Sequence, residues 1–258
     1  MLAREKPQPA YFSSQCAHNF VFEIMDNDTK ASIYHSTPYM AAGSAMMSFK
    51  PISAIHQHLC AFHVYSQDRT RHLEAHHYCT HLSHDFHQCI IYDSDKPNAK
   101  LIGIEYIVSE ELFDTLPQDE KKFWHSHQYE VESGFLQMQT VDLVPGVVND
   151  VAEQPAMLQI QKTYGKTIHT WPVDTSPDLP IGPPNIMVSY TTDGQGPPPD
   201  FVKARDERCG MDTDAKRKLR AGYLPPYKKR ADADQWEKTG KGLVFEPKEV
   251  DYKPYTGP

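Results

Sequence analysis

The sequence contains no long hydrophobic run. Its mean hydropathy is −0.60, and no apolar stretch approaches the roughly 18–20 residues that span a bilayer, which excludes an integral membrane protein. The opening residues, MLAREKPQPAYFSSQ, lack the apolar core of a secretory signal, so we expect none. These absences predict a soluble, cytoplasmic protein.

Cysteine is scarce and never occurs as a CxxC pair. The odd number of cysteines, five, argues against a disulfide framework, and the missing CxxC pairs argue against a zinc ribbon. They are Cys16, Cys60, Cys79, Cys89 and Cys209. Three of them, Cys60, Cys79 and Cys89, alternate with apolar neighbours and are expected to be small core residues rather than nucleophiles. We therefore expect a reduced, intracellular protein.

Positive charge is also in deficit, since 26 Lys and Arg stand against 34 Asp and Glu. The acidic surplus lies in the first three quarters of the chain, whereas the last 63 residues are mildly basic. A nucleic-acid-binding domain needs a dominant basic surface, so we expect no nucleic-acid partner. GxSxG, GxxxxGK[ST] and HExxH motifs are absent, as is a GxGxxG motif after a strand, which removes the best-defined hydrolase, nucleotide-binding and zinc-protease signatures.

Histidine, by contrast, is abundant. The chain has 14 histidines, and nine of them lie between His56 and His87. Histidine is the commonest metal ligand in proteins and titrates near neutral pH. The histidines therefore direct the search for a functional site.

Four segments between residues 55 and 108 are rich in β-branched and aromatic side chains. They read IHQHLCAFHVY, HLEAHHYCTHL, FHQCIIYD and KLIGIEYIV. The turn sequence Ser94-Asp95-Lys96-Pro97-Asn98 separates the last two, which is typical of neighbouring strands. A helix remains an alternative for the first segment. Together they predict an antiparallel meander.

Helices are expected after the meander. Ser109 can cap a first helix, and Pro117 can begin a second helix over residues 117–133 that ends at Gly134. A further short helix is expected in MLQIQKTYGK, ending at Gly165.

Composition divides the chain into three parts. Residues 1–50 are weakly patterned and predict an N-terminal arm with little independent structure. Residues 51–193 predict a single α+β domain, an antiparallel sheet covered by one or two helices. Residues 194–258 are rich in proline and charge and predict an extended C-terminal tail that wraps the body or stays mobile.

Strand parity divides the residues of segment 72–81 between two faces. One face carries His72, Glu74, His76 and Tyr78, and the other carries Leu73, Ala75, His77 and Cys79. The second face is more apolar and should point to the core, with His77 either a hydrogen-bonded structural residue or a ligand. On the first face Glu74 and His76 form half of a site for zinc, iron or manganese.

A second histidine pair lies in the predicted helix. His125 and His127 can chelate one metal only from an extended backbone, because alternate residues diverge on a helix. Since we favour the helix, the useful pair is His127 with Glu130, one turn apart, and His125 is the weaker ligand.

Four stretches of the sequence together resemble the oil body-associated protein family, a domain-of-unknown-function family of plants, fungi and bacteria. They are HLCAFHVYSQDRTRHLEAHHYCTHLSHDFHQCIIYDSD, AKLIGIEYIVSEELFDTLPQDEKKFWHSHQYEVESG, KTYGKTIHTWPVD and LPIGPPNIMVSY. The resemblance covers roughly residues 55–190. It implies association with oil bodies for plant members but implies no defined activity.

The resemblance ranks the histidines. The family pattern matches this chain at His63, Glu74, His76, His77, Gln88, Glu105, His125, His127, Glu130 and His169. It usually has other residues in place of His72, His84 and His87, so these three, together with His81, are expected at the surface.

These observations predict an oil body-associated-like protein with a histidine-rich pocket that binds a divalent transition metal. The expected ligands or acid-base groups are His76, His77, His127, Glu130 and His169. An enzyme of this kind would act on a small oxygenated or lipid-like substrate, with Glu130 or Glu74 as general base. Two alternatives stay open: a non-catalytic lipid-droplet protein with structural histidines, and a metal-free acid-base isomerase or lyase. The oligomeric state stays open as well.

Overall fold

The computed structural model describes residues 26–141 and 143–255, and the chain forms two compact units, an N-terminal unit that ends at Ile52 and a second unit that begins at Ser53. The N-terminal unit contains α2 (Asn27–Ile33), α3 (Thr37–Met46) and most of α4 (Lys50–Ser53). Asp26 and Ser36 cap the first two helices, because their side chains accept hydrogen bonds from backbone N–H groups in the first turn.

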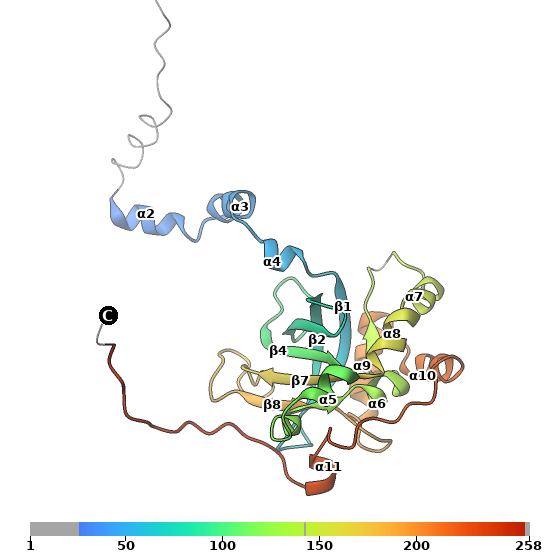
Figure 1. Ribbon diagram of the computed structural model, residues 1–258. Coiled ribbons are helices and arrows are strands. Elements are labelled where there is room, and N and C mark those ends of the chain that lie inside the picture. The colour runs from blue at the N-terminus through green and yellow to red at the C-terminus, as the bar shows by residue number, and fades with distance from the viewer. Residues whose placement is uncertain (1–25, 142, 256–258) are drawn as a thin grey trace, which may run out of the picture. The chain divides into compact units, whose positions relative to one another are not determined.

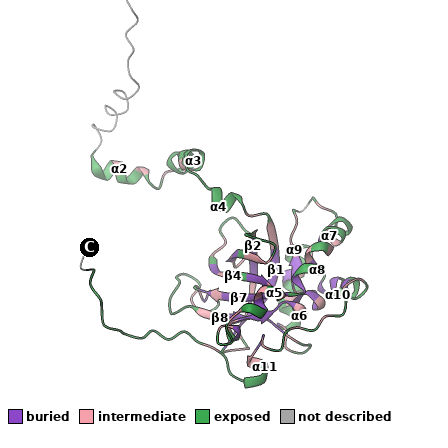
Figure 2. Ribbon diagram, in the orientation of Figure 1, coloured by how far each residue is buried: buried purple, intermediate pink, exposed green. Residues whose placement is uncertain are grey.

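The described part of the N-terminal arm, residues 26–50, is therefore largely helical, although its sequence is weakly patterned. Residues 1–25 of the predicted arm, and Cys16 with them, lie outside the described residues. No residue of α2, α3 or α4 is buried, and Figure 2 shows these helices as exposed.

The second unit is built on a closed antiparallel sheet (Figure 1). Six strands close the sheet in the order β2–β3–β4–β7–β8–β1, because β1 pairs with β2 as well as with β8. They are β1 (Gln57–Tyr65), β2 (His72–His81), β3 (Phe86–Tyr92), β4 (Leu101–Ser109), β7 (Thr163–His169) and β8 (Asn185–Val188). Two short strands, β5 (His125–Ser126) and β6 (Gln137–Met138), pair with β7 and β1. This α+β architecture confirms the fold class.

Alternation along the strands fills the interior of this barrel. The side chains of Leu73, Ala75, His77 and Cys79 are buried on one face of β2, as strand parity predicts. Cys79 lies directly opposite Cys89 of β3, and the two form a disulfide. Both residues are buried in the core, as expected, but they form a disulfide where the sequence predicts reduced cysteines. Their pairing follows from the strand register, which an odd cysteine count does not reveal.

Three short elements replace the single helix expected over residues 117–133. They are a 3₁₀ turn (Lys121–Phe123), strand β5 and α6 (Gln128–Ser133). The backbone is extended at Trp124 because β5 pairs with β7, a tertiary interaction that overrides local helix signals. The helix end at Gly134 is confirmed, since this glycine has the left-handed φ of 82° that favours glycine at a C-terminus.

The other helices cover the sheet. Ser109 caps α5 (Glu110–Thr115), as expected, by accepting a 3.2 Å hydrogen bond from the Leu112 N–H. Helices α7 (Gly146–Ala152) and α8 (Gln154–Ile160) follow, and α8 ends before Gly165, which lies in β7 instead of ending a helix. Within the described residues, no helix is both long enough and apolar enough to cross a membrane.

The C-terminal part of the chain begins as helices that pack on the sheet. These are α9 (Pro199–Cys209), α10 (Thr213–Ala221) and α11 (Trp236–Thr239). Arg205 of α9 and Arg220 of α10 are fully buried. Residues 241–255 have no helix or strand and form the extended part of the tail.

Candidate metal centre

Buried histidines from several elements meet inside the closed sheet. His63 of β1, His77 of β2 and His169 of β7 point into the barrel, together with Glu105 of β4. His125, in strand β5, and His127, which directly precedes α6, join this group. Every one of these side chains is at most 3% exposed. So many buried polar groups require partners, because each loses its hydration on burial.

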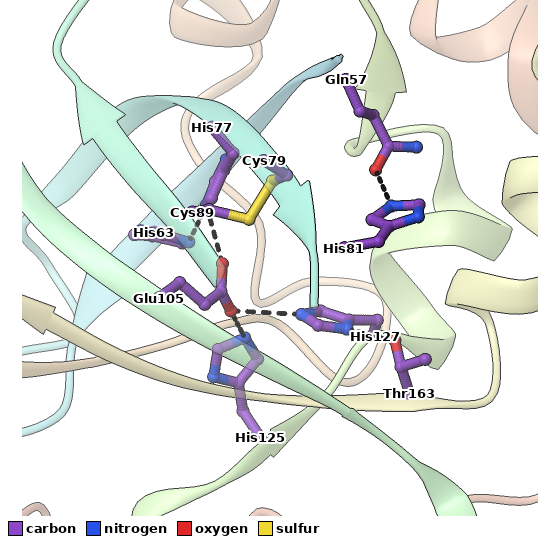
Figure 3. Close-up of a disulfide and its surroundings, with 10 residues drawn as sticks. All are labelled: Gln57, His63, His77, Cys79, His81, Cys89, Glu105, His125, His127 and Thr163. Atoms are coloured by element: carbon purple, nitrogen blue, oxygen red, sulfur yellow. Dashed lines mark hydrogen bonds and ion pairs between the residues drawn. A yellow bond between two sulfur atoms is a disulfide. The ribbon is translucent and has the colours of Figure 1, made fainter. Parts of the chain in front are cut away.

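Glu105 lies at the centre of the group (Figure 3). Its Oε2 atom is 2.9 Å from Nε2 of His77. Its Oε1 atom is 3.4 Å from Nε2 of His125 and 3.3 Å from Nε2 of His127. One carboxylate therefore faces three imidazole nitrogens. Glu105 belongs to two sets of candidate metal ligands, one with His63 and His77 and the other with His125 and His127.

A threonine fixes the orientation of His127. The Thr163 hydroxyl donates to the backbone carbonyl of Ile160 at 2.8 Å, so its oxygen is left to accept the hydrogen bond from Nδ1 of His127, also at 2.8 Å. In a neutral ring Nε2 then carries the lone pair and directs it toward Glu105. A hydrogen-bond acceptor behind the ring is the usual support for a metal-binding histidine.

His125 has no such support. Among the described residues, neither of its ring nitrogens has a hydrogen-bond partner, although Nε2 lies 3.4 Å from Glu105. Ligand atoms around a tetrahedral metal with bonds of about 2.0–2.1 Å lie about 3.3–3.4 Å apart. The contacts of Glu105 with His125 and His127 have these separations.

The protonation states suit a cation. Burial lowers the pKa of His125 and of His169 to about 3, so both rings are neutral at physiological pH. Burial alone would raise the pKa of Glu105, but its interactions with His127 and His77 outweigh burial and hold that pKa well below its ordinary value. Neutral imidazoles around an ionised carboxylate are the forms that bind metals.

The nearby carboxyl of Glu130 behaves in the opposite way. Burial, and then the charge of Glu105, raise the pKa of Glu130 well above its ordinary value, which favours the protonated form. Its Oε2 atom is 3.9 Å from Nε2 of His125. Both carboxyl groups border a cavity of about 10 Å³, together with His63, His77 and His127. Such a volume holds about one water molecule or one ion.

The structure thus brings together four of the residues selected from sequence, and separates a fifth. His77, His127 and Glu130 border the cavity, and His169 contacts the group through His63, with 3.0 Å between their nitrogens. His76 lies on the opposite face of β2, where it pairs with Glu74. The two adjacent histidines of β2 therefore belong to different sites.

Three central residues were not selected from sequence. Glu105 and His63 are part of the family pattern but lacked a local signal for a ligand. His125 was ranked as the weaker ligand because a helix was expected there, whereas the observed extended backbone turns it toward Glu105. Of the four histidines expected at the surface, His81 and His84 are exposed, whereas His72 and His87 are half-buried.

Comparisons with known proteins agree with the sequence resemblance. The family model described as "Protein of unknown function (DUF1264)" matches residues 49–223. Oil body-associated protein 1B of Arabidopsis thaliana is 45% identical over 213 residues, which cover 83% of this chain and 84% of the relative. Oil body-associated protein 1A of Zea mays is 44% identical, with 81% and 84% covered. Oil body-associated protein 2B of Arabidopsis thaliana is 40% identical, with 90% of each covered. No solved structure matches the chain. This chain belongs to the oil body-associated protein family.

Proposed function

We propose that the interior of the closed sheet binds a divalent transition metal ion, of the zinc, iron or manganese class. Glu105, His125 and His127 are the proposed primary ligands, and His77 approaches the second oxygen of the same carboxylate. The observation that carries the proposal is the pair of 3.3–3.4 Å contacts between Glu105 Oε1 and two histidine Nε2 atoms. A cation between these atoms would remove the repulsion between the carboxylate and a ring lone pair that faces it.

The alternatives are less well supported. A purely structural histidine cluster should satisfy its ring nitrogens, yet the described residues leave both nitrogens of His125 without a hydrogen bond. A metal-free isomerase or lyase needs room for an organic substrate, whereas the cavity of about 10 Å³ has room for one water or ion. The protonated form of Glu130 favours an acid or hydrogen-bond donor over the general base expected from sequence.

Metal analysis of the purified full chain tests the proposal. Replacing His125 and His127 by alanine should lower the bound transition metal by about one equivalent per chain relative to the wild type. The matched control is His84→Ala, because His84 is exposed and, within the part of the chain that the structure describes, pairs with Asp85 alone. Circular dichroism should show that each variant is folded. Equal metal content in the wild type and the folded double variant would contradict the proposal.

We also propose that the N-terminal unit contacts the surface of oil bodies. The relatives are named for oil body association, and helices α2–α4 bury none of their own residues. Residues 31–53 contain a single charged residue, Lys50. Their exposed apolar side chains include those of Met46, Met47, Phe49 and Ile52. A weakly charged surface with exposed apolar groups suits the boundary between phospholipid headgroups and acyl chains.

Flotation with phospholipid-coated triacylglycerol droplets tests this contact. Glutamine at Met46, Met47, Phe49 and Ile52 should weaken droplet binding at least about tenfold, because several apolar side chains no longer enter the lipid. The control places glutamine at four other exposed apolar positions, Leu143, Val147, Val148 and Val151. Equal flotation of both variants and the wild type would show that another surface makes the contact.

A further inference from the structure

A second group of metal-ligating side chains lies on the outer face of the closed sheet. Cys60 of β1 and His76 of β2 are directly opposite in the strand register, and both are fully buried. Glu74 follows on the same face of β2, and Cys209 reaches the group from the C-terminal end of α9. One ligand atom of each residue lies within 4.8 Å of those of the other three. Two thiols, an imidazole and a carboxylate therefore converge on one point.

The separations suit a metal after a small rearrangement. The Sγ atom of Cys60 is 3.9 Å from Nε2 of His76 and 4.0 Å from Oε1 of Glu74. Sulfur and nitrogen ligands of a tetrahedral zinc ion lie roughly 3.5 Å apart, given bonds of about 2.3 and 2.0 Å. Nε2 of His76 is 2.6 Å from Oε1 of Glu74, a hydrogen bond that a metal would replace with two coordinate bonds.

The ring of His76 is held from behind. Its Nδ1 atom lies 3.0 Å from Nε2 of His58, and the His58 ring stacks on Tyr78 with 4.3 Å between centroids. When Nδ1 donates to His58, the lone pair of Nε2 points at Cys60 and Glu74. This is the outer support that fixes the tautomer of metal-binding histidines.

Two arginines balance the negative charge that such a site would carry. The guanidinium of Arg205, fully buried, donates to Sγ of Cys60 at 3.6 Å, and Arg208 pairs with Glu74. Burial raises the pKa of the Cys60 thiol well above its ordinary value, and the guanidinium of Arg205 opposes this effect. Two thiolates, one carboxylate, a divalent ion and two guanidinium groups sum to a positive charge of one, so the buried group is close to neutral.

We propose that Cys60, Glu74, His76 and Cys209 form a binding site for a thiophilic divalent ion, zinc in the first place. A ligand set of two sulfurs, one nitrogen and one oxygen is typical of zinc rather than of magnesium, calcium or manganese. The site is separate from the interior centre, because its ligands lie on the other face of β1 and β2. An entry route exists, since Cys209 and Arg208 line a surface cavity of about 410 Å³.

Titration of the reduced full chain with Co²⁺ tests this site. Cobalt bound to a thiolate gives a near-ultraviolet charge-transfer band that nitrogen and oxygen ligands do not give, so the interior centre does not contribute. A thiol count first establishes that Cys60 and Cys209 are reduced. The band should saturate at about one equivalent of Co²⁺ and disappear when Zn²⁺ is added, because zinc binds the same ligands more tightly than cobalt.

Three variants complete the test. Cys209→Ser changes a half-buried residue with little risk to the fold and should weaken the band at least about twofold, because one of the two sulfur ligands is lost. Cys60→Ser combined with Cys209→Ser should abolish it. Glu105→Gln should leave it intact, which separates this site from the interior centre. A wild-type protein that gives no band with both thiols reduced, or an undiminished band in folded Cys209→Ser, would overturn the proposal.

Discussion

Gly165→Ala is expected to lower the free energy of unfolding by at least about 2 kcal/mol and to abolish metal binding at the interior centre. A Cβ at this position would lie 2.8 Å from Nε2 of His127 and 2.9 Å from Cε1 of His125, and it would overlap Oε1 of Glu105. Since all three side chains are buried, none can move into solvent. The substitution therefore displaces the carboxylate that connects the histidines. Urea unfolding and metal analysis measure the two effects.

Gly146→Ala is the matched control. Gly146 is the first residue of α7, and a Cβ there would meet no atom within 4 Å. Alanine is a better helix former than glycine, so stability should stay within about 0.5 kcal/mol of the wild type or rise. Metal content should not change. If Gly165→Ala is as stable as this control and binds as much metal, the packing of the interior centre is not as described.

The two faces of β2 could be predicted because they depend only on local alternation. The segment is bounded by polar residues, and its apolar residues recur at every second position, so parity alone assigns His77 to the interior and His76 to the outer face. The sequence does not predict which residues contact each face of β2. His77 pairs with Glu105, which lies 28 positions further along the chain. The residues grouped with His76 include Cys209 in α9.

The position of Glu105 explains why the sequence does not predict the full set of residues in the interior centre. Parity within β4 places Glu105 on the same face as Gly103 and Ile107, but it does not say which residue faces them. The strand register identifies the neighbours, because Glu105 pairs with Cys89, and Cys89 pairs with Cys79, which is two residues from His77. A register irregularity between Ile91 and Tyr92 shifts the β3–β4 pairing, so counting from the turn at 94–98 would not have given it.

The backbone around His125 and His127 differs from the expected helix for a related reason. Pro117 and Gly134 are strong local signals for the two ends of a helix, and the second was correct. Between them, however, residues 125 and 126 pair with Tyr164 and Gly165 of β7, nearly 40 residues later in the chain. Pairing at that separation overrides local propensity and cannot be read from the segment itself.

Helix α10 packs against α6, the helix that follows His127, and Arg220 of α10 bonds to α6 and to the loop after it. Its Nη1 atom donates to the backbone carbonyls of Val131 at 2.7 Å and Leu136 at 2.8 Å. Its Nη2 atom donates to Oε1 of Glu153 at 3.0 Å, and both side chains are fully buried. The carbonyl of Val131 belongs to the last turn of α6, where it also accepts a 3.3 Å hydrogen bond from the N–H of Gly134. Arg220 therefore closes the end of the helix whose start carries a proposed metal ligand.

Arg220→Met is expected to lower the free energy of unfolding by about 3–5 kcal/mol, measured by urea unfolding. Methionine keeps much of the side-chain volume but removes the hydrogen bonds from Arg220 to two buried carbonyls, of which that of Val131 keeps the 3.3 Å bond from the Gly134 N–H. It also leaves Lys216, 3.1 Å away, as the one cationic partner of Glu153 among the described residues. Arg217→Met is the control from the same helix, because Arg217 pairs with Asp193 at the surface and its loss should cost less than about 1 kcal/mol.

A double-mutant cycle locates the effect of Arg220 more sharply. If the loss comes from an uncompensated buried charge, adding Glu153→Gln to Arg220→Met should recover roughly 1 kcal/mol or more, because the glutamine is neutral. The carbonyls of Val131 and Leu136 still lack their hydrogen bonds from Arg220, so recovery should be incomplete. Arg220→Met should also weaken metal binding at the interior centre, since His127 directly precedes α6 as its N-cap residue. Additive effects of the two substitutions, or an Arg220→Met protein as stable as Arg217→Met, would contradict this role for the C-terminal helices.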